Sequence, residues 1–388
     1  MPVKNRFAEL LPEITAWRRD FHEHPELLYD VHRTAGRVAD LLRSFGVDEV
    51  TEGIGQTGVV GVIKGKTDSK GRVIGLRADM DALPINEITG VEYASKTPGK
   101  MHACGHDGHT AMLLGAAKYL AETRNFDGTA VVIFQPAEEG GAGGDAMVKD
   151  GLIDRWKIDE VYGMHNMPGI PVGAFAIRPG AMMAAADQFD ITVTGKGGHA
   201  AKPHECIDTV LVTAHIITAL QSIISRNVDP LKNGVVSACV VSTDSTAHNV
   251  IPQVVQIKGT ARSLDPGVRT QLEEGITRIA TNTAAAFGAT AKVDYHRGYP
   301  VTMNDETATV WAADVARDIA GDVDLTIDPM MGGEDFSFML NERPGAYIFV
   351  GNGDTAMVHH PAYNFNDDAI PAGSSWYAGM VEARLPAA

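Results

Sequence analysis

Continuous apolar runs that alternate with helical patterns constrain the fold of this chain more than any other feature. Residues 59–63 and 72–76 are two such runs, and neither shows the polar alternation of a half-exposed strand. Residues 5–23 carry apolar side chains at helical spacing, and Pro25 follows as a stop signal. Buried strands that alternate with helices predict an α/β fold, in which helices cover a sheet.

The same alternation continues through the first half of the chain. Further helices are predicted at residues 34–45, 106–122 and 144–150, and further strands at 128–134 and 160–164. In sheets of this class the functional loops lie beyond the carboxyl ends of the strands. The polar clusters described below each follow one of these strands or begin the next helix, which is where a site is expected.

The pattern changes near Ala185 and changes back after Tyr299. The elements predicted between them are strands at 189–194, 235–241 and 254–261 and helices at 206–226 and 267–287. This mixture predicts a compact α+β unit inserted into the main domain. Because 388 residues exceed what one core usually serves, we expect a main domain formed by residues 1–184 and 297–388, with residues 185–296 as the insertion.

Composition excludes several functional classes. The formal charge is −16, from 33 Lys and Arg against 49 Asp and Glu, and no basic run stands out, so a nucleic-acid partner is not expected. Residues 1–11 are mixed polar without the apolar core of a secretion signal, and no stretch approaches the ~20 apolar residues that span a bilayer. We therefore expect a cytoplasmic protein without a membrane partner. Cys104, Cys206 and Cys239 are too few and too scattered for a disulfide framework.

Residues 101–110, MHACGHDGHT, gather three imidazoles and a thiol in a segment that two glycines make flexible. Cys and His are the side chains that bind zinc-like metals most readily, and Cys104 and His106 stand two positions apart. The segment therefore predicts a metal site. The alternative is that its histidines cap the start of a helix.

Glu138 and Glu139 follow the predicted strand 128–134, so one carboxylate can bind a metal while the other accepts a proton. Taken alone, two adjacent glutamates are more often solvated surface acids. His165 follows the strand 160–164, where a single histidine is more often structural. Because other candidate metal-binding clusters occur in the same sequence, we favour a functional role for Glu138, Glu139 and His165.

Two further clusters contribute candidates. His359 and His360 precede an acidic segment at 365–368, which can supply acceptors for neutral imidazoles. Asp79 and Asp81 follow the buried run 72–76, where carboxylates are costly unless they bind a metal or accept hydrogen bonds. We expect Asp79 to orient a metal ligand, whereas Asp81 could equally cap the turn before Pro84.

The order and spacing of these segments resemble the M20 family of metallohydrolases, and within it the aminoacylase and hippurate-hydrolase-like branch. The resemblance covers nearly the whole chain. The matching motifs are RADMDALP from Arg77, CGHDGH from Cys104, the pair Glu138–Glu139, His165 and His359. The resemblance implies a zinc-exopeptidase-like catalytic domain with Glu138 as the general base of a two-metal site. The ligands that it implies are Cys104, His106, Glu139, His165 and His359.

Two positions depart from the majority of the family. Arg77 and Cys104 stand where most M20 peptidases have a His and a bridging Asp, which is the pattern of the aminoacylase-like branch. The departure favours acylated amino acids over peptides as substrates. The implied cofactors are two divalent ions, with Zn, Mn, Co and Ni left open.

The resemblance also implies that residues 185–296 form a lid that serves dimerisation. His199 matches a residue that assists at the scissile carbonyl, often across a dimer interface, and a donor there stabilises the oxyanion. Arg262 matches a position that holds the substrate, and its planar fork suits a carboxylate. The residues expected to contact the substrate are His199, Asn249, Arg262, Gly332 and Gly333. A homodimer is expected, and a homotetramer is the alternative.

The expected reaction is hydrolysis of an N-acyl amino acid to a carboxylic acid and a free amino acid. Glu138 would take the proton of the attacking water and return it to the leaving amine. A dipeptidase or a deacetylase of the N-acetyl-diaminopimelate type is the alternative within the family. Outside it stand a metal-free thiol hydrolase with Cys104 as nucleophile and a metal-binding protein without turnover. The presence of Glu138 disfavours the last.

Overall fold

The chain folds into two compact units, and the computed structural model describes residues 5–387. The first unit comprises the chain up to Met182 together with Met303–Asp328 and the chain from Asp335 onward. The second comprises Met183–Thr302 and Pro329–Glu334. Residues 1–4 and 388, which belong to the predicted first and last segments of the main domain, lie outside the described residues.

The observed boundaries between the units differ from the predicted ones at three places. Residues 183–184, 297–302 and 329–334, predicted in the main domain, belong to the second unit. Strand β13 (Thr290–Tyr299) runs past the predicted boundary because Tyr299 still pairs with Ala186. The backbone N–H of Ala184 donates to the carbonyls of Met330 and Gly332. Backbone pairing sets these boundaries, and a hydrophobic pattern does not encode it.

An eight-stranded mixed sheet organises the first unit, in the order β1-β2-β4-β3-β5-β16-β6-β15. Its strands are β1 (Glu49–Ile54), β2 (Gly58–Lys64), β3 (Val73–Asp79), β4 (Thr129–Gln135), β5 (Glu160–Pro168), β6 (Phe175–Ala176), β15 (Val323–Asp324) and β16 (Gly345–Gly353). β3 runs parallel to both β4 and β5, and β5 runs parallel to β16. The carboxyl ends of these strands therefore meet at one edge of the sheet. The predicted α/β class is confirmed.

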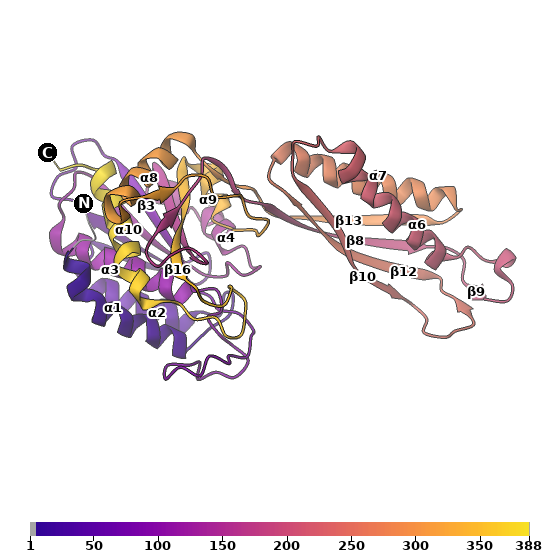
Figure 1. Ribbon diagram of the computed structural model, residues 1–388, viewed down its shortest axis with the longest axis horizontal. Helices are drawn as coiled ribbons and strands as arrows, with labels where there is room; N and C mark the ends of the chain where they lie inside the picture. The colour runs from indigo at the N-terminus through magenta and orange to yellow at the C-terminus, as the bar shows by residue number, and fades with distance from the viewer. Residues whose placement is uncertain (1–4, 388) are drawn as a thin grey trace. The chain divides into compact units, whose positions relative to one another are not determined.

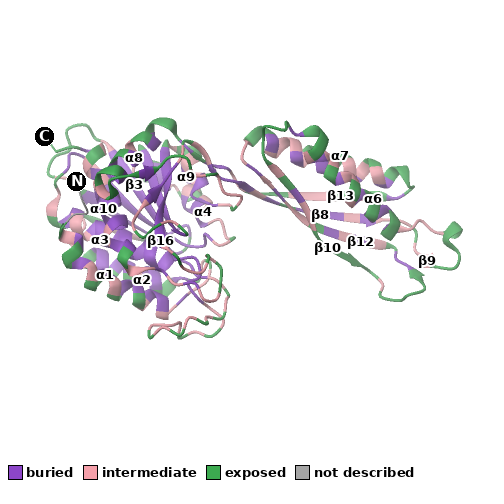
Figure 2. Ribbon diagram, in the orientation of Figure 1, coloured by how far each residue is buried: buried purple, intermediate pink, exposed green. Residues whose placement is uncertain are grey.

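Helices cover both faces of this sheet. They are α1 (Asn5–Glu23), α2 (His32–Ser44), α3 (His106–Thr123), α4 (Gly143–Lys149), α5 (Leu152–Arg155), α8 (Glu306–Ala320), α9 (Ser337–Glu342) and α10 (Ile370–Arg384), with a 3-10 turn at Asp367–Ala369. Figure 1 draws α1, α3 and α10 to the left of β16 and α4 and α9 to its right. Every residue of β3 and β5 is buried accordingly, and the central strands appear purple in Figure 2.

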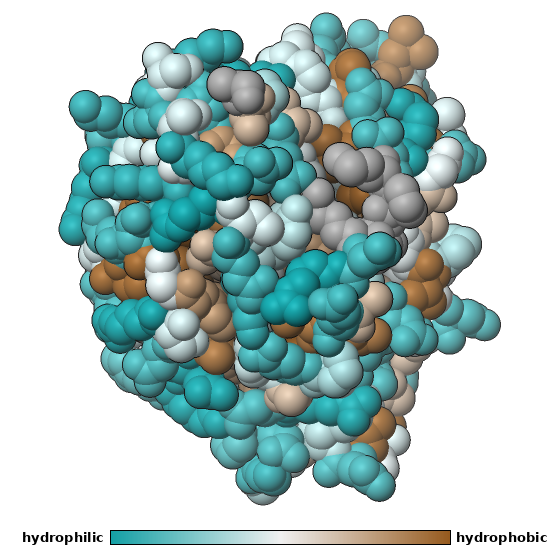
Figure 3. Space-filling view, turned by 90° about the vertical axis from the view of Figure 1, so that its left-hand side faces the viewer, coloured by the Kyte–Doolittle hydropathy of each residue, from teal (hydrophilic) through white to brown (hydrophobic). Residues whose placement is uncertain are grey.

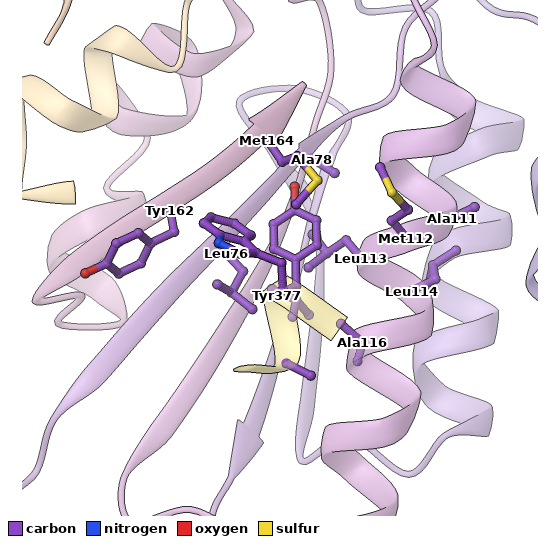
Figure 4. Close-up of a cluster of buried hydrophobic side chains, with 14 of the residues drawn as sticks. Leu76, Ala78, Ala111, Met112, Leu113, Leu114, Ala116, Tyr162, Met164 and Tyr377 are labelled. Carbon is purple, nitrogen blue, oxygen red and sulfur yellow. The ribbon is translucent and has the colours of Figure 1, made fainter. Parts of the chain in front are cut away.

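The core between α3 and the sheet is built from apolar side chains of mixed size. Leu76 of β3 and Met112 and Leu113 of α3 are fully buried, with Tyr377 of α10 among them (Figure 4). The Tyr377 hydroxyl donates to the carbonyl oxygen of Arg77 at 2.7 Å, so the polar atom brought into the core is paired. This packing fixes α3, whose first residue is His106, against the end of β3.

The second unit is a four-stranded antiparallel sheet with two helices. Its elements are β8 (Ala185–Thr194), β10 (Gly234–Thr243), β12 (Val254–Ser263), β13, α6 (Thr209–Ser222) and α7 (Pro266–Ala286), and the strand order is β10-β12-β8-β13. Phe189, Ile191 and Val193 alternate along β8 with more exposed residues, so one face of the sheet forms the core. Figure 1 shows α6 and α7 on the same side of this sheet.

Shorter elements complete the chain. The strands β9 (Gly198–His199) and β11 (Val250–Ile251) pair with each other, a 3-10 turn spans Pro203–Glu205, and a π-helical turn at Ile223–Asn227 extends α6. The strands β7 (Gly180–Met183) and β14 (Thr302–Asn304) lie where the chain passes from one unit to the other.

One helical stretch, Thr209–Asn227, is long and apolar enough to cross a membrane by length and composition. This corrects the expectation that no stretch approaches that length. Val212, Ile216 and Leu220 of this stretch are buried in the core of the second unit. Because the core helices of water-exposed domains meet the same criteria, length and composition alone are weak support for a membrane span.

The surface of the first unit is mainly hydrophilic on the face seen in Figure 3, with apolar side chains in small separate groups. Scattered apolar exposure of this kind is ordinary for folded proteins. Many of the large apolar side chains of this unit are instead buried in a core to which α1, α3, α10 and the central strands contribute.

A buried ion cluster joins α1 to the start of α3. Arg18 Nη1 and His22 Nδ1 lie 3.4 and 2.8 Å from Asp107 Oδ2, and His22 Nε2 lies 3.2 Å from Glu87 Oε1. Burial by itself lowers the pKa of His22, but the charge of Asp107 and the hydrogen bonds to Asp107 and Glu87 outweigh it and raise the pKa to about 9. The ring is therefore a buried cation between two carboxylates at neutral pH.

This cluster predicts that the protein loses stability as the pH rises. Because the folded pKa of His22, about 9, lies above the ordinary value of 6.5, its contribution is complete below pH 6.5 and is lost as the pH rises through 9. Urea unfolding should give a smaller free energy at pH 9 than at pH 6.5. The difference should shrink in His22→Gln but not in His32→Gln, whose ring is exposed. Equal pH slopes in wild type and H22Q would contradict this account.

Candidate metal centre

The edge of the sheet where β3, β4 and β5 end brings the polar clusters together. Asp79 is the last residue of β3, Glu138 and Glu139 lie in the turn after β4, and His106 begins α3. His165 was predicted to follow its strand, and this is wrong, because β5 continues to Pro168. The strand continues since β16 pairs along it, with Phe349 opposite His165. His165 is thus held by a sheet ladder rather than by a loop.

Four side chains converge on the sulfur of Cys104. Two groups whose ligand atoms lie within 4.8 Å of one another share this residue: one adds His106 and His165, and the other adds Glu139 and His359. Cys104 Sγ lies 3.3 Å from His165 Nε2, and His359 Nε2 lies 3.3 Å from Glu139 Oε1. Together the two groups contain all five residues predicted as ligands, and Cys104 is the residue that they share.

Hydrogen bonds on the outer side of two rings fix which nitrogen faces the cluster. His106 Nδ1 donates to the carbonyl of Asp81 at 2.8 Å, and His165 Nδ1 donates to the carbonyl of Asn166 at 2.5 Å. Both rings therefore present Nε2 inward. His106 Nε2 and Glu139 Oε1 are buried without a hydrogen-bond partner, although buried polar atoms are nearly always paired. A thiol, imidazoles and an orphaned carboxylate oxygen fit a zinc-like divalent ion.

His359 joins this cluster and His360 does not. The backbone of His359 has the unusual φ of +67°, and its N–H donates to the carbonyl of Ala103 at 2.7 Å. This conformation carries the ring to Glu139. His360 Nδ1 instead accepts the backbone N–H of Ala362 at 3.0 Å. Backbone geometry thus decides between His359 and His360 as the candidate ligand, a choice that the sequence left open.

The electrostatics of Cys104 argue against a thiol nucleophile. Burial raises the pKa of this thiol, and the charge of Glu139 adds to the effect. A nucleophilic cysteine requires a lowered pKa, whereas a metal ion beside the sulfur would supply the positive charge that deprotonates it. Burial also lowers the pKa of His165, and His109 adds to that shift. His165 is therefore neutral, as a metal ligand must be.

Asp81 holds the two glutamates beside the ligands. Its carboxylate accepts the backbone N–H of Glu138 at 2.9 Å and of Glu139 at 3.1 Å. Ligand atoms of His106, Glu138 and Glu139 lie within 4.8 Å of one another, and Glu138 is buried. Asp81 therefore caps a turn, but the turn after β4 rather than the one before Pro84. The Glu138 carboxylate therefore lies next to the proposed ligands His106 and Glu139, where a general base is expected.

Asp79 orients His109 rather than a member of the ligand cluster. Its Oδ1 lies 2.6 Å from His109 Nδ1 and its Oδ2 accepts a hydrogen bond from Arg77 at 2.8 Å, whereas His106 Nε2 is 3.7 Å from Oδ2. Burial alone would raise the pKa of Asp79, but the charges of His106 and Arg77 and the hydrogen bond from His109 hold it well below its usual range. The roles of His109 and Asn166 were missed; His109 could have been found from its place in the segment 101–110, whereas the role of Asn166 depends on contacts that only the fold creates.

In the second unit, the predicted substrate residues fall into two groups. Arg262 pairs with Ala186 at the start of β8. A Cβ added to Gly333 would lie 2.8 Å from Ala186 Cβ, and the carbonyl of Gly332 accepts the N–H of Ala184 at 2.9 Å. The structure therefore brings Arg262, Gly332 and Gly333 to one end of this sheet.

His199 and Asn249 lie at the other end of the same sheet. His199 pairs with Val250 in the small β9–β11 ladder, which follows the last residue of β8, Thr194. The neighbouring Ala200 N–H donates to the carbonyl of Asn249 at 3.0 Å. Ala186, which pairs with Arg262, and Thr194 lie about 26 Å apart along β8, at roughly 3.3 Å per residue. The structure therefore does not bring His199 and Arg262 together within one chain.

Comparison with known proteins places the chain among metallohydrolases. Residues 75–383 match the pattern of the peptidase family M20/M25/M40. The chain is 44% identical to the hippurate hydrolase of Campylobacter jejuni over 96% of both chains, and 41% identical to the N-acetyl-L-cysteine deacetylase of Bacillus subtilis over 94% of this chain and 86% of the other. A dinuclear metal-binding M20 peptidase from Bacillus subtilis shares the structure with a TM-score of 0.86 and 33% identity, over 98% of this chain and 100% of the other.

Gly105, at the turn into α3, has no room for a side chain. Its φ is +92°, and an added Cβ would lie 2.2 Å from Asn166 Nδ2 and 2.5 Å from the Tyr363 hydroxyl. Gly105→Ala should therefore displace Asn166 and destabilise the protein by about 2 kcal/mol or more.

Thermal unfolding and metal analysis should show the loss of both stability and bound metal. The control is Gly36→Ala in α2, where an added Cβ has nothing within 4 Å, and which should be neutral or stabilising by about 0.4–1 kcal/mol. A Gly105→Ala protein with wild-type stability and metal content would contradict the packing described for this turn.

Proposed function

The chain belongs to peptidase family M20/M25/M40, in its aminoacylase and hippurate-hydrolase-like branch, and on this premise we propose that it hydrolyses N-acyl amino acids to a carboxylic acid and a free amino acid. The family expected from the motifs is confirmed, and with it a metal-dependent hydrolase that acts on amide bonds. The observation that carries the proposal is the ligand cluster around Cys104 with the Glu138 carboxylate fixed beside it.

The proposed site holds two divalent ions through Cys104, His106, Glu139, His165 and His359. When bound, such ions supply Lewis acidity, which acidifies water and polarises an amide carbonyl. Thiolate and imidazole ligands suit Zn, Co or Ni, and Mn is the further candidate. A cytoplasmic location, as expected from the composition, would keep the Cys104 sulfur reduced and able to bind.

Glu138 carries the proton in this proposal. Its carboxylate takes a proton from the attacking water and delivers it to the nitrogen of the leaving amino acid. Two features of the chain support this role. The bond from its backbone N–H to Asp81 fixes its position, and its carboxylate lies within 4.8 Å of ligand atoms of His106 and Glu139. Glu139, the neighbour that shares the Asp81 cap, serves as a ligand instead.

Arg262 is proposed to bind the free carboxylate of the substrate. The guanidinium donates from Nη1 to the carbonyls of Asp187 and Ala261 and to the Thr260 hydroxyl. Within the described residues no hydrogen bond leaves Nε or Nη2, so this edge of the fork is open to a planar carboxylate. The neighbouring backbone of Gly332 and Gly333 is the corresponding candidate for contact with the acyl part.

The separation of His199 from Arg262 supports a homodimer. One small substrate cannot reach both ends of a sheet that spans about 26 Å between them. If both residues act on the same substrate, as proposed, His199 comes from a second copy of the chain. A two-fold dimer would supply it at both sites, since such an interface is self-complementary.

Exchange of Glu138 tests the reaction. Glu138→Gln should keep its metal and its unfolding temperature but lose about 10²- to 10⁴-fold in kcat, because the proton carrier is gone. Glu139→Gln should instead lose metal. The assay is a panel of benzoyl- and acetyl-amino acids with metal-stripped protein resupplied with Zn, Mn, Co or Ni. Wild-type turnover in E138Q, or activity that resists chelation, would overturn the proposal.

Mixing two inactive variants tests the shared site. His199→Ala and Arg262→Ala should each be nearly inactive alone. After unfolding and refolding together they should recover about a quarter of wild-type activity, because roughly half of the dimers are mixed and one of the two sites in each is complete. Refolding each variant alone is the control. A mixture no more active than its components would show that both residues act within one chain.

A further inference from the structure

His109 is the third imidazole of the segment 101–110 and lies against the ligand cluster without belonging to it. Its ring is fully buried, and its centroid is 4.6 Å from that of His165 and 5.5 Å from that of His106. The spacing of three residues puts His106 and His109 on one face of α3. By proximity alone His109 is a candidate ligand, since it also lies close to Asp79 and His106.

Both nitrogens of His109 are already committed to hydrogen bonds. Nδ1 lies 2.6 Å from Asp79 Oδ1, and a carboxylate can only accept, so this nitrogen carries the proton. Nε2 lies 2.9 Å from the backbone nitrogen of Asn166, which donates to it, and 3.0 Å from Asn166 Nδ2. The neutral ring has no lone pair left for a metal ion. It joins a carboxylate on β3 to an amide on β5.

Asn166 passes this constraint on to two of the proposed ligands. Its Nδ2 also donates to the carbonyl of Cys104 at 2.7 Å, and its own carbonyl accepts His165 Nδ1 at 2.5 Å. Its Oδ1 accepts the Tyr363 hydroxyl at 2.6 Å. Asn166 therefore contacts the backbone of Cys104 through its side-chain amide and the ring of His165 through its main-chain carbonyl. The acceptor at His109 Nε2 fixes the plane of the side-chain amide and the direction of the main-chain N–H of Asn166.

The other end of the chain of bonds is rigid. Asp79 accepts a hydrogen bond from Arg77 Nη1 at 2.8 Å, and Arg77 Nη2 donates to Asp335 at 2.9 Å. All three side chains are buried. Gln135 donates to the same Asp335 carboxylate at 2.7 Å. His109 is thus held from β3 by an ion-paired carboxylate, and it cannot turn without leaving a buried polar group unpaired.

We propose that His109 is a positioning residue of the metal centre: by accepting two hydrogen bonds from Asn166, it sets the Cys104 carbonyl and the His165 ring and thereby the affinity for metal. The inference rests on the proposed metal-dependent function. It assigns His109 no contact with metal or substrate. Groups of this kind, one step behind the ligands, typically change metal affinity by about 10- to 100-fold when they are removed.

Two substitutions separate the two ends of the His109 ring. In His109→Gln the side-chain oxygen can take the place of Nε2 and accept from Asn166. In His109→Asn the amide nitrogen can take the place of Nδ1 and donate to Asp79, but nothing reaches Asn166. The matched control is Thr110→Val, which removes a buried hydrogen bond of 2.7 Å from the same helix to the carbonyl of Asp79 and leaves Asn166 untouched.

The experiment measures the affinity of each metal-stripped protein for Zn²⁺ by competition with a chelator, and the absorption spectrum of the Co²⁺-loaded protein, which reports on thiolate and imidazole ligands. Thermal unfolding of the metal-free proteins shows whether each variant folds. His109→Asn should bind Zn²⁺ about 10- to 100-fold more weakly with an altered Co²⁺ spectrum, while His109→Gln and Thr110→Val stay within about threefold of wild type.

Wild-type affinity and spectrum in His109→Asn would overturn the inference, and so would equal losses in the Asn and Gln variants. If His109→Asn does not fold without metal, His109→Gln decides alone: near wild-type affinity supports the role of Nε2, and a loss of tenfold or more, about the lower bound for such groups, excludes it. A wild-type protein that bound no metal would overturn both this inference and the proposed function, so the two failures are distinguishable.

Discussion

The carboxylate of Asp81 joins the ends of two strands and the start of a helix. It accepts hydrogen bonds from the backbone N–H groups of Glu138 and Glu139. The main-chain carbonyl of Asp81 accepts a hydrogen bond from Nδ1 of His106. Burial raises the pKa of Asp81, and the hydrogen bonds with His106 and with the backbone N–H of Glu139 oppose this shift. Without this residue the proposed base and two proposed ligands would lose their fixed positions together, so the cluster depends on one short link between β3 and the turn after β4.

Much of the candidate site could be predicted from the sequence because metal-binding side chains are chemically distinctive. Cys104 and His106 stand out in any sequence, and a Glu pair after a buried strand completes the signal. Asn166 gives no such signal, since an amide inside a strand has no special role until the fold brings His109 and Tyr363 to it. The same holds for the choice between adjacent histidines near the C-terminus, which a single backbone angle decides.

The buried strands could be predicted because apolar runs on both faces leave a plain pattern, and β2, β3 and β4 lie within a few residues of their predicted positions. The ends of strands could not, because partner strands set them, as β16 does for β5. The edge strand β13 was missed for a related reason. β13 is exposed or half-exposed along its whole length, so it shows no apolar run, and its pairing with β8 appears only in the folded chain.

The arrangement of the ligands along the chain has a consequence for synthesis. Four of the proposed ligands precede the second unit, and the fifth, His359, follows it near the end of the chain. While the chain leaves the ribosome, the whole second unit is made after the first four ligands and before the fifth. The complete set is available only after the second unit has been translated. Until then the nascent chain presents an incomplete chelator, and full coordination requires a segment made after the second unit.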